Sequence, residues 1–202
     1  MRTPQSDTAV AQPAIHATPS DELVLASGIR VRVRPVLPAD RERQADLFAR
    51  LSPESRRRRY LIAKNALTAR ELNYLSEIDQ CTHAAFAALD ERDGSMVGIS
   101  RYVRHTASSA GAESAAEVAV EVADAFQRMG IGTMLAMHAV AHARRNRIGV
   151  LTATTLWENR PARALLRRLG FHARASHGSD IDYELKLKPA VRRSQQADLI
   201  DR

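Results

Sequence analysis

Two segments of the chain alternate apolar and charged residues with the period of a β-strand. Residues 29–36, IRVRVRPV, carry an apolar side chain at every second position and arginine between them. One face of this predicted strand is therefore buried and the other is basic. In residues 116–124, AEVAVEVAD, valines alternate with Glu117 and Glu121. Since successive strand residues point to opposite faces, both carboxylates are expected on the face opposite the valines.

The remaining pattern predicts one α/β domain over residues 21–188. Strand 116–124, a helix that ends near Arg144 and a strand at 149–156 form a β-α-β unit, so these two strands should be parallel. The polar, proline-containing residues 1–20 are expected to be a disordered arm, and residues 189–202 a flexible tail. Further predicted strands are residues 23–25, 82–89, 95–105, 171–175 and 181–187, a loop spans 106–114, and further helices begin near Pro38, Pro53, Thr68 and Asn159.

The sequence QRMGIG, residues 127–132, joins strand 116–124 to the following helix. Gly130 and Gly132 have no Cβ, so successive main-chain N–H groups can approach an anion, and the helix N-terminus adds partial positive charge. Leu135 stands where the dinucleotide-binding fingerprint has its third glycine, and the Gly-Lys-Ser/Thr of a Walker loop is absent. The turn is predicted to hold a diphosphate, and neither nucleotide-binding motif describes it.

The spacing Gln-x-x-Gly-x-Gly, followed by Asn159 and by ALLRRLGF at residues 164–171, resembles the acyl-CoA-binding core of the GNAT superfamily of N-acyltransferases. The resemblance implies a mixed central sheet of about six to seven strands with flanking helices. Its parallel central strands splay apart, pantetheine enters between them, and acetyl-CoA is the cosubstrate. The residues that the resemblance assigns to the cofactor are Val122, Ala123, Gln127, Arg128, Met129, Gly130, Ile131, Gly132, Thr133 and Asn159. Backbone groups of the first two are expected to be free to bond it.

The N-terminal half resembles one branch of that superfamily, the bacterial protein-lysine acetyltransferases. Residues 25–40, LASGIRVRVRPVLPAD, and 47–60, LFARLSPESRRRRY, carry this likeness. It implies a protein lysine as acceptor, and a small-molecule amine is the alternative. The branch places its proposed general base ten residues before the loop glutamine, which here is Glu117, with Glu121 in reserve. A carboxylate helps because a free lysine amine has a pKa of about 10.4, although a solvated face or pairing with basic residues would also explain both acids.

The group that protonates the departing thiolate is not evident. Many GNAT enzymes have a tyrosine near the CoA sulfur in Asn-x-x-Ala-x-x-Leu-Tyr, whereas this chain reads NRPARALL, with Leu166 at that position. Water, Asn159 or Tyr183 are substitutes that the sequence leaves open. Asn159 could equally be an ordinary N-cap of the helix that follows it.

The composition favours a polyanionic partner. The formal net charge is +7 and the isoelectric point about 10.3, which fits CoA phosphates, acidic proteins or nucleic acid. A non-catalytic acyl-CoA sensor or nucleic-acid-binding module is therefore the rival hypothesis from another functional class. In that case the arginine run 56–59 would form a patch that binds a polyanion; otherwise it is a solvated helix surface. Nucleic acid is disfavoured because aromatic residues make up only 4% of the chain.

Other chemistry is disfavoured by the residues available. Cys81 is the single cysteine, so no intramolecular disulfide is possible and a reducing cytoplasm is expected. No uncharged stretch is long enough to span a bilayer, and the first twenty residues lack a signal-peptide core, so neither membrane insertion nor export is expected. His138 and His142 are four residues apart on a predicted helix, but without a third ligand no metal site is predicted.

Overall fold

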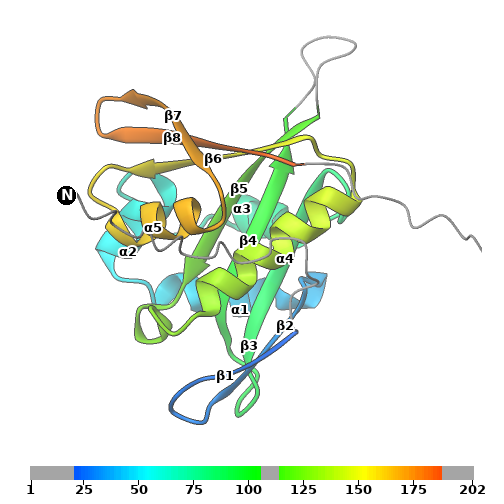
Figure 1. Ribbon diagram of the computed structural model, residues 1–202. Helices are drawn as coiled ribbons and strands as arrows, with labels where there is room; N and C mark the ends of the chain where they lie inside the picture. Colours follow the sequence, from blue (N-terminus) through cyan, green and yellow to red (C-terminus); the bar gives the residue numbers. More distant parts are fainter. Residues whose placement is uncertain (1–20, 106–113, 188–202) are drawn as a thin grey trace, which may run out of the picture.

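A computed structural model describes residues 21–105 and 114–187 of the protein (Figure 1). Eight strands form one sheet in the order β1-β2-β3-β4-β5-β6-β8-β7. Neighbouring strands are antiparallel except β5 and β6, which are parallel. The strands are β1 (Glu22–Val24), β2 (Arg30–Pro35), β3 (His83–Asp90), β4 (Met96–Arg104), β5 (Ala115–Val122), β6 (Val150–Leu156), β7 (His172–His177) and β8 (Asp180–Lys186).

The predicted mixed α/β sheet is confirmed, but it has eight strands and not six to seven. The residue pattern predicted all eight strands, and only the count implied by the resemblance was lower; the short β1 and the hairpin of β7 and β8 extend the sheet at its edges. The expected arm at residues 1–20, the tail at 189–202 and most of the loop at 106–114 lie outside the described residues.

Five helices cover the sheet. Figure 1 shows α4 crossing one face of the sheet, with α1 and α3 behind it. Leu165 and Leu166 of α5 pack on the same core cluster as α4, so α5 belongs to the α4 face, while α2 contacts β5 and β6. The helices are α1 (Arg41–Ala49), α2 (Pro53–Tyr60), α3 (Ala69–Ser76), α4 (Ile131–Arg145) and α5 (Arg160–Arg168). Single 3-10 turns at Pro38–Asp40 and Asp124–Phe126 precede α1 and follow β5.

Helix α4 approaches the sheet closely over β4 and β5. The Ser100 hydroxyl donates to the Leu135 carbonyl at 2.8 Å. A Cβ on Gly98 would lie 3.0 Å from both the Glu121 carbonyl oxygen and Leu135 Cδ1. Since real Cβ atoms tolerate such contacts poorly, glycine at this position allows the helix, β4 and β5 to pack together.

The pairing between β5 and β6 stops early. It comprises only Ala115 with Val150, Ala116 with Leu151 and Glu117 with Thr152. Beyond these pairs each strand keeps its antiparallel partner, β5 with β4 to Val122 and β6 with β8 to Leu156. The two central strands therefore splay apart, as the resemblance implied.

No helix among the described residues is long and apolar enough to cross a bilayer.

A buried ion pair holds the start of α1 against β2. The Asp40 side chain is buried and accepts hydrogen bonds from Arg34 Nη1 and Nη2 at 2.6 and 2.7 Å and from the Leu37 amide at 2.9 Å. Burial opposes ionisation, but these hydrogen bonds and the charge of Arg34 outweigh it and lower the pKa of Asp40.

Replacing Asp40 with alanine should lower the free energy of unfolding by about 3 kcal/mol at neutral pH, because Arg34 keeps a half-buried charge without its partner. The folded-state pKa of Asp40 is depressed, so this stabilisation is present above about pH 4 and is lost as the pH falls through the folded pKa. Urea unfolding at several pH values checks both points. Asp46→Ala, at an exposed position of α1, is the control and should change little; equal losses in both variants would contradict the assignment.

Candidate active site

The turn between β5 and α4 has a backbone suited to an anion. Gly130 is the N-cap of α4 with φ of 91°, and Arg128 also has a positive φ, of 62°. No hydrogen bond joins the successive amides of residues 128–132 to another described residue. A left-handed residue on each side of Met129 and an open helix N-terminus turn N–H groups toward solvent, the arrangement that binds phosphate.

Polar side chains dock this turn against the start of α2. Gln127 Nε2 donates to the Val122 carbonyl at 3.1 Å, to Asp124 Oδ1 at 2.9 Å and to Ser55 Oγ at 3.2 Å. Asp124 in turn accepts from the Ser52 amide at 2.7 Å and from the Ser55 hydroxyl. The Gln127 side chain is thus occupied within the protein, and it fixes the loop in place.

The gap between β5 and β6 exposes main-chain groups of β5. The Ala123 amide donates to the Val97 carbonyl of β4 at 2.9 Å, and hydrogen-bonded pairs alternate along an antiparallel ladder. By this alternation Val120 and Val122 turn their N–H and C=O groups away from β4, toward the gap that opens beyond Glu117. The expectation that the Ala123 amide is free is wrong, because β4 holds it; Val120 offers a free amide in its place.

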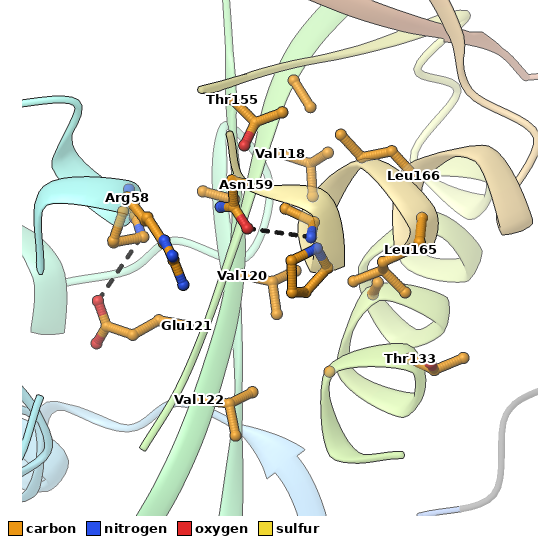
Figure 2. Close-up of a pocket in the computed structure, with 18 of the residues that line it drawn as sticks. Arg58, Val118, Val120, Glu121, Val122, Thr133, Thr155, Asn159, Leu165 and Leu166 are labelled. Carbon is orange, nitrogen blue, oxygen red and sulfur yellow. Dashed lines mark hydrogen bonds and ion pairs between the residues drawn. The ribbon is translucent and has the colours of Figure 1, made fainter. Parts of the chain in front are cut away.

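The gap contains a cavity of about 590 Å³, which extends to α2, α4 and α5. In Figure 2, Val118, Val120 and Val122 project toward it from β5, while Leu165 and Leu166 face it from α5. Both candidate bases line it, as do seven of the residues predicted to bind the cofactor: Val122, Gln127, Arg128, Gly130, Gly132, Thr133 and Asn159. The side chain of Ile131 is buried in the core instead, and that of Met129 is exposed.

One end of the cavity lies at the start of α5. Asn159 is buried there, and its Oδ1 accepts from the Ala162 amide at 3.2 Å, so the residue is an N-cap. Leu166 lines the cavity but has no hydroxyl, and Tyr183, one of the proposed substitutes, lies in the core away from the lining. Thr155 lines this end with a hydroxyl that sequence reasoning missed.

The two glutamates lie on the same face of β5 but in different surroundings. Val118 and Val120 pack against the core beneath α4, and Glu121 interacts with α2 on the other side of the sheet. Glu117 is exposed, at the last residue where β5 pairs with β6, and has no partner among the described residues.

Glu121 belongs to a buried charged cluster. Its Oε2 lies 3.7 Å from Nε of Arg59, with which it forms an ion pair. Burial raises the pKa of the Tyr60 hydroxyl, and the charge of Glu121 raises it further. Burial and the neighbouring Arg59 lower the pKa of Arg101 to about 10, against the opposing effect of Glu121. The carboxylate of Glu121 thus stabilises cations that α2 and β4 bring together.

The arginine run on α2 is engaged within the protein. Arg56 donates to the main-chain carbonyls of Phe48, Ala49 and Asn65. Arg57 forms ion pairs with Glu54 and with Glu158, in the turn before α5, and Arg58 pairs with Glu54 at 2.7 Å. These contacts hold α2 over the gap, and they leave little of the run for a separate polyanion patch.

The histidines of α4 have structural partners. His142 Nδ1 lies 2.8 Å from the Tyr102 hydroxyl and 3.1 Å from Asn146 Nδ2, and burial lowers the pKa of the imidazole. His138 Nε2 lies 3.6 Å from Asp21. Within residues 21–105 and 114–187, no group of three or more histidine, cysteine, aspartate or glutamate side chains could hold a metal ion.

Known proteins share this sequence and fold. Acetyltransferase PA5475 of Pseudomonas aeruginosa is 36% identical over 149 residues, which are 73% of this chain and 77% of that protein. The crystal structure of the GNAT domain of S. lividans PAT superposes with a TM-score of 0.75 at 28% identity, over 82% of this chain and 96% of that one. The structure of yncA, a putative acetyltransferase from Salmonella typhimurium with its cofactor acetyl-CoA, has a TM-score of 0.65, with 80% of this chain and 96% of that one covered. At 18% identity it shows the fold alone.

The profile of the Acetyltransferase (GNAT) family matches residues 47–171. This range runs from the last turn of α1 to just beyond α5 and includes the turn before α4, both candidate bases and the gap between β5 and β6. The protein therefore belongs to the GNAT acetyltransferase family.

Proposed function

We propose that the protein transfers the acetyl group of acetyl-CoA to a primary amine, most favourably a protein lysine, by direct attack in a ternary complex. The observation that carries this proposal is the cavity between β5 and β6, which joins the open amides of the phosphate-binding turn to two carboxylates. A pyrophosphate fits the amides of residues 128–132. Pantetheine then fits the gap, where the Val120 main chain and the Val122 amide offer it the hydrogen bonds of a missing strand.

Glu117 is the better candidate for the general base. Attack on the thioester requires a neutral amine, so a carboxylate at the cavity must take a proton from the lysine ammonium, directly or through water. The side chain of Glu117 is exposed and has no partner in residues 21–105 and 114–187, whereas that of Glu121 is buried and already ion-paired with Arg59. The surroundings of Glu121 suit a structural role, in which it holds α2 over the cavity.

An exposed base favours an acceptor that arrives from solvent. Glu117 stands at the edge where the two strands part, so a lysine on the surface of another protein could reach it without entering an enclosed chamber. The likeness of residues 25–60 to bacterial protein-lysine acetyltransferases supports the same acceptor. Small amines remain the alternative acceptor class.

Incubation with radiolabelled acetyl-CoA separates these acceptors. We expect label in proteins when the enzyme is added to a cell lysate, and little label in a panel of free polyamines, amino acids and aminoglycosides. Label found only in small molecules would contradict the protein-lysine proposal. Duplex DNA binding with a strong salt dependence, and no transfer to any acceptor, would favour a nucleic-acid-binding module instead.

Glu117→Gln should lower kcat by about 10² to 10⁴ at neutral pH, because the isosteric amide cannot accept the amine proton. Affinity for CoA, measured by calorimetry, should be nearly unchanged. Glu121→Gln is the matched control on the same strand face. It should lower the midpoint of thermal unfolding, because its ion pair with Arg59 is weakened, and it should leave kcat less affected than Glu117→Gln does. Wild-type turnover in Glu117→Gln would contradict this assignment and make Glu121 the candidate for the general base.

Gly130→Val should weaken CoA binding at least tenfold. The position has φ of 91°, and a β-branched residue there costs about 1.4 kcal/mol or more, which distorts the turn that presents the amides. Gly178→Val is the control, since Gly178 also has a positive φ, of 59°, but lies in the turn between β7 and β8. Calorimetry should show wild-type CoA affinity for this control; unchanged affinity in Gly130→Val would contradict the placement of the pyrophosphate.

A further inference from the structure

The hydroxyl of Thr155 is a buried polar group without a partner. Thr155 lies on β6 with 3% of its surface exposed, and its Oγ1 makes no hydrogen bond within the described residues. The neighbouring threonines of the strand differ: Thr154 Oγ1 donates to Asp182 at 2.8 Å, and Thr152 Oγ1 donates to the Ala116 carbonyl at 3.4 Å. An unpaired buried hydroxyl lowers the stability of the folded protein. We therefore expect a bound ligand to form a hydrogen bond with the Thr155 hydroxyl.

This hydroxyl lies at the end of the cavity that is remote from the phosphate-binding turn. In Figure 2, Thr155 and Asn159 stand at one end of the cavity, and Val122 and Thr133 stand at the other, next to the turn. The thioester and the diphosphate are at opposite ends of pantetheine. With the diphosphate on the turn, an extended pantetheine in the gap therefore brings the sulfur to the end lined by Thr155.

The apolar surroundings of that end strengthen a hydrogen bond from a single donor. Val118, Leu165 and Leu166 line it with hydrocarbon, and a hydrogen bond in such a setting is stronger than in water. The Asn159 side chain is held as the N-cap of α5, with its Oδ1 accepting from the Ala162 amide. Main-chain amides of β5 within the gap can donate hydrogen bonds to the acyl carbonyl. The thioester sulfur is then the acceptor left for a side-chain hydroxyl at this end.

We propose that Thr155 donates a hydrogen bond from its hydroxyl to the sulfur of acyl-CoA and stabilises the thiolate as it leaves; this inference rests on the proposed function. In the step, the amine nitrogen forms a bond to the acyl carbon and the C–S bond breaks with its electron pair on sulfur. The general base passes the ammonium proton to solvent before the attack, and it takes the second proton from nitrogen as the amide forms. Thr155 keeps its own proton and shares it with the thiolate, which takes a proton from solvent after release.

The pKa of the thiol of bound CoA tests the contact without any acceptor. The thiolate absorbs in the ultraviolet, so the pKa is read by titrating CoA complexes against the same protein without CoA. A Cys81→Ser background is needed because Cys81 is an exposed thiol. Thr155→Val should raise the pKa of the bound thiol by about one unit, since the thiolate loses its donor. Thr155→Ser should keep the wild-type value, and so should the control Thr154→Val, whose hydroxyl is committed to Asp182.

Equal thiol pKa values in wild type and Thr155→Val would overturn the inference.

Transfer kinetics give a second readout: kcat should fall about ten- to hundredfold in Thr155→Val and recover in Thr155→Ser, with a small change in KM for acetyl-CoA. The midpoint of thermal unfolding of Thr155→Val should equal or exceed that of wild type, because an unpaired buried hydroxyl is removed. Failure of the wild-type protein to bind CoA would overturn the proposed function itself, whereas binding and transfer with no effect of Thr155→Val would remove only this inference.

Discussion

The early end of pairing between β5 and β6 is the constraint on which the site depends. Three residue pairs join the strands, and beyond Glu117 each strand follows its own antiparallel partner. The main-chain groups of Val120 and Val122 then face a cavity where a sheet would normally supply a strand. Since such groups need hydrogen-bond partners, the split sheet offers an extended chain a place to pair, and the turn at Gly130 adds open amides suited to an anion.

Helix α2 completes the site through polar contacts to three of its walls. Ser52 and Ser55 bind Asp124 beside the phosphate-binding turn, Arg57 binds Glu158 before α5, and Arg59 pairs with Glu121 on β5. The helix has no fully buried residue of its own, and these contacts set its position together with the packing of Arg56 and Tyr60 on the Phe48 ring. The serine-proline-glutamate-serine segment and the arginine run thus share one task. Ser52, Ser55 and Arg59 connect the turn before α4 to the strand that carries both glutamates.

Features encoded by local period or by glycine could be predicted from the sequence. The alternation in residues 29–36 and 116–124 predicted β2 and β5, the helix start near Thr68 predicted α3, and QRMGIG predicted the turn before α4. Contacts between distant segments could not be predicted: Ser55 and Asp124 are 69 residues apart, and no local pattern records their hydrogen bond. The period placed Glu117 and Glu121 on one face, but only tertiary packing of α2 buries one and leaves the other exposed. The hydroxyl of Thr155 is unpaired for the same reason, since its partners depend on where β5 and α5 lie.

Amide hydrogen exchange measured by NMR, with and without CoA, tests the central claim most directly. In the free protein the amides of Val120, Val122 and residues 128–132 should exchange quickly, because no described residue accepts a hydrogen bond from the turn and β6 has left β5. Saturating CoA should protect both sets together, while amides already paired between β3 and β4 change little. Tight CoA binding that leaves the Val120 and Val122 amides unprotected would contradict the account, because the cofactor would then lie outside the split sheet.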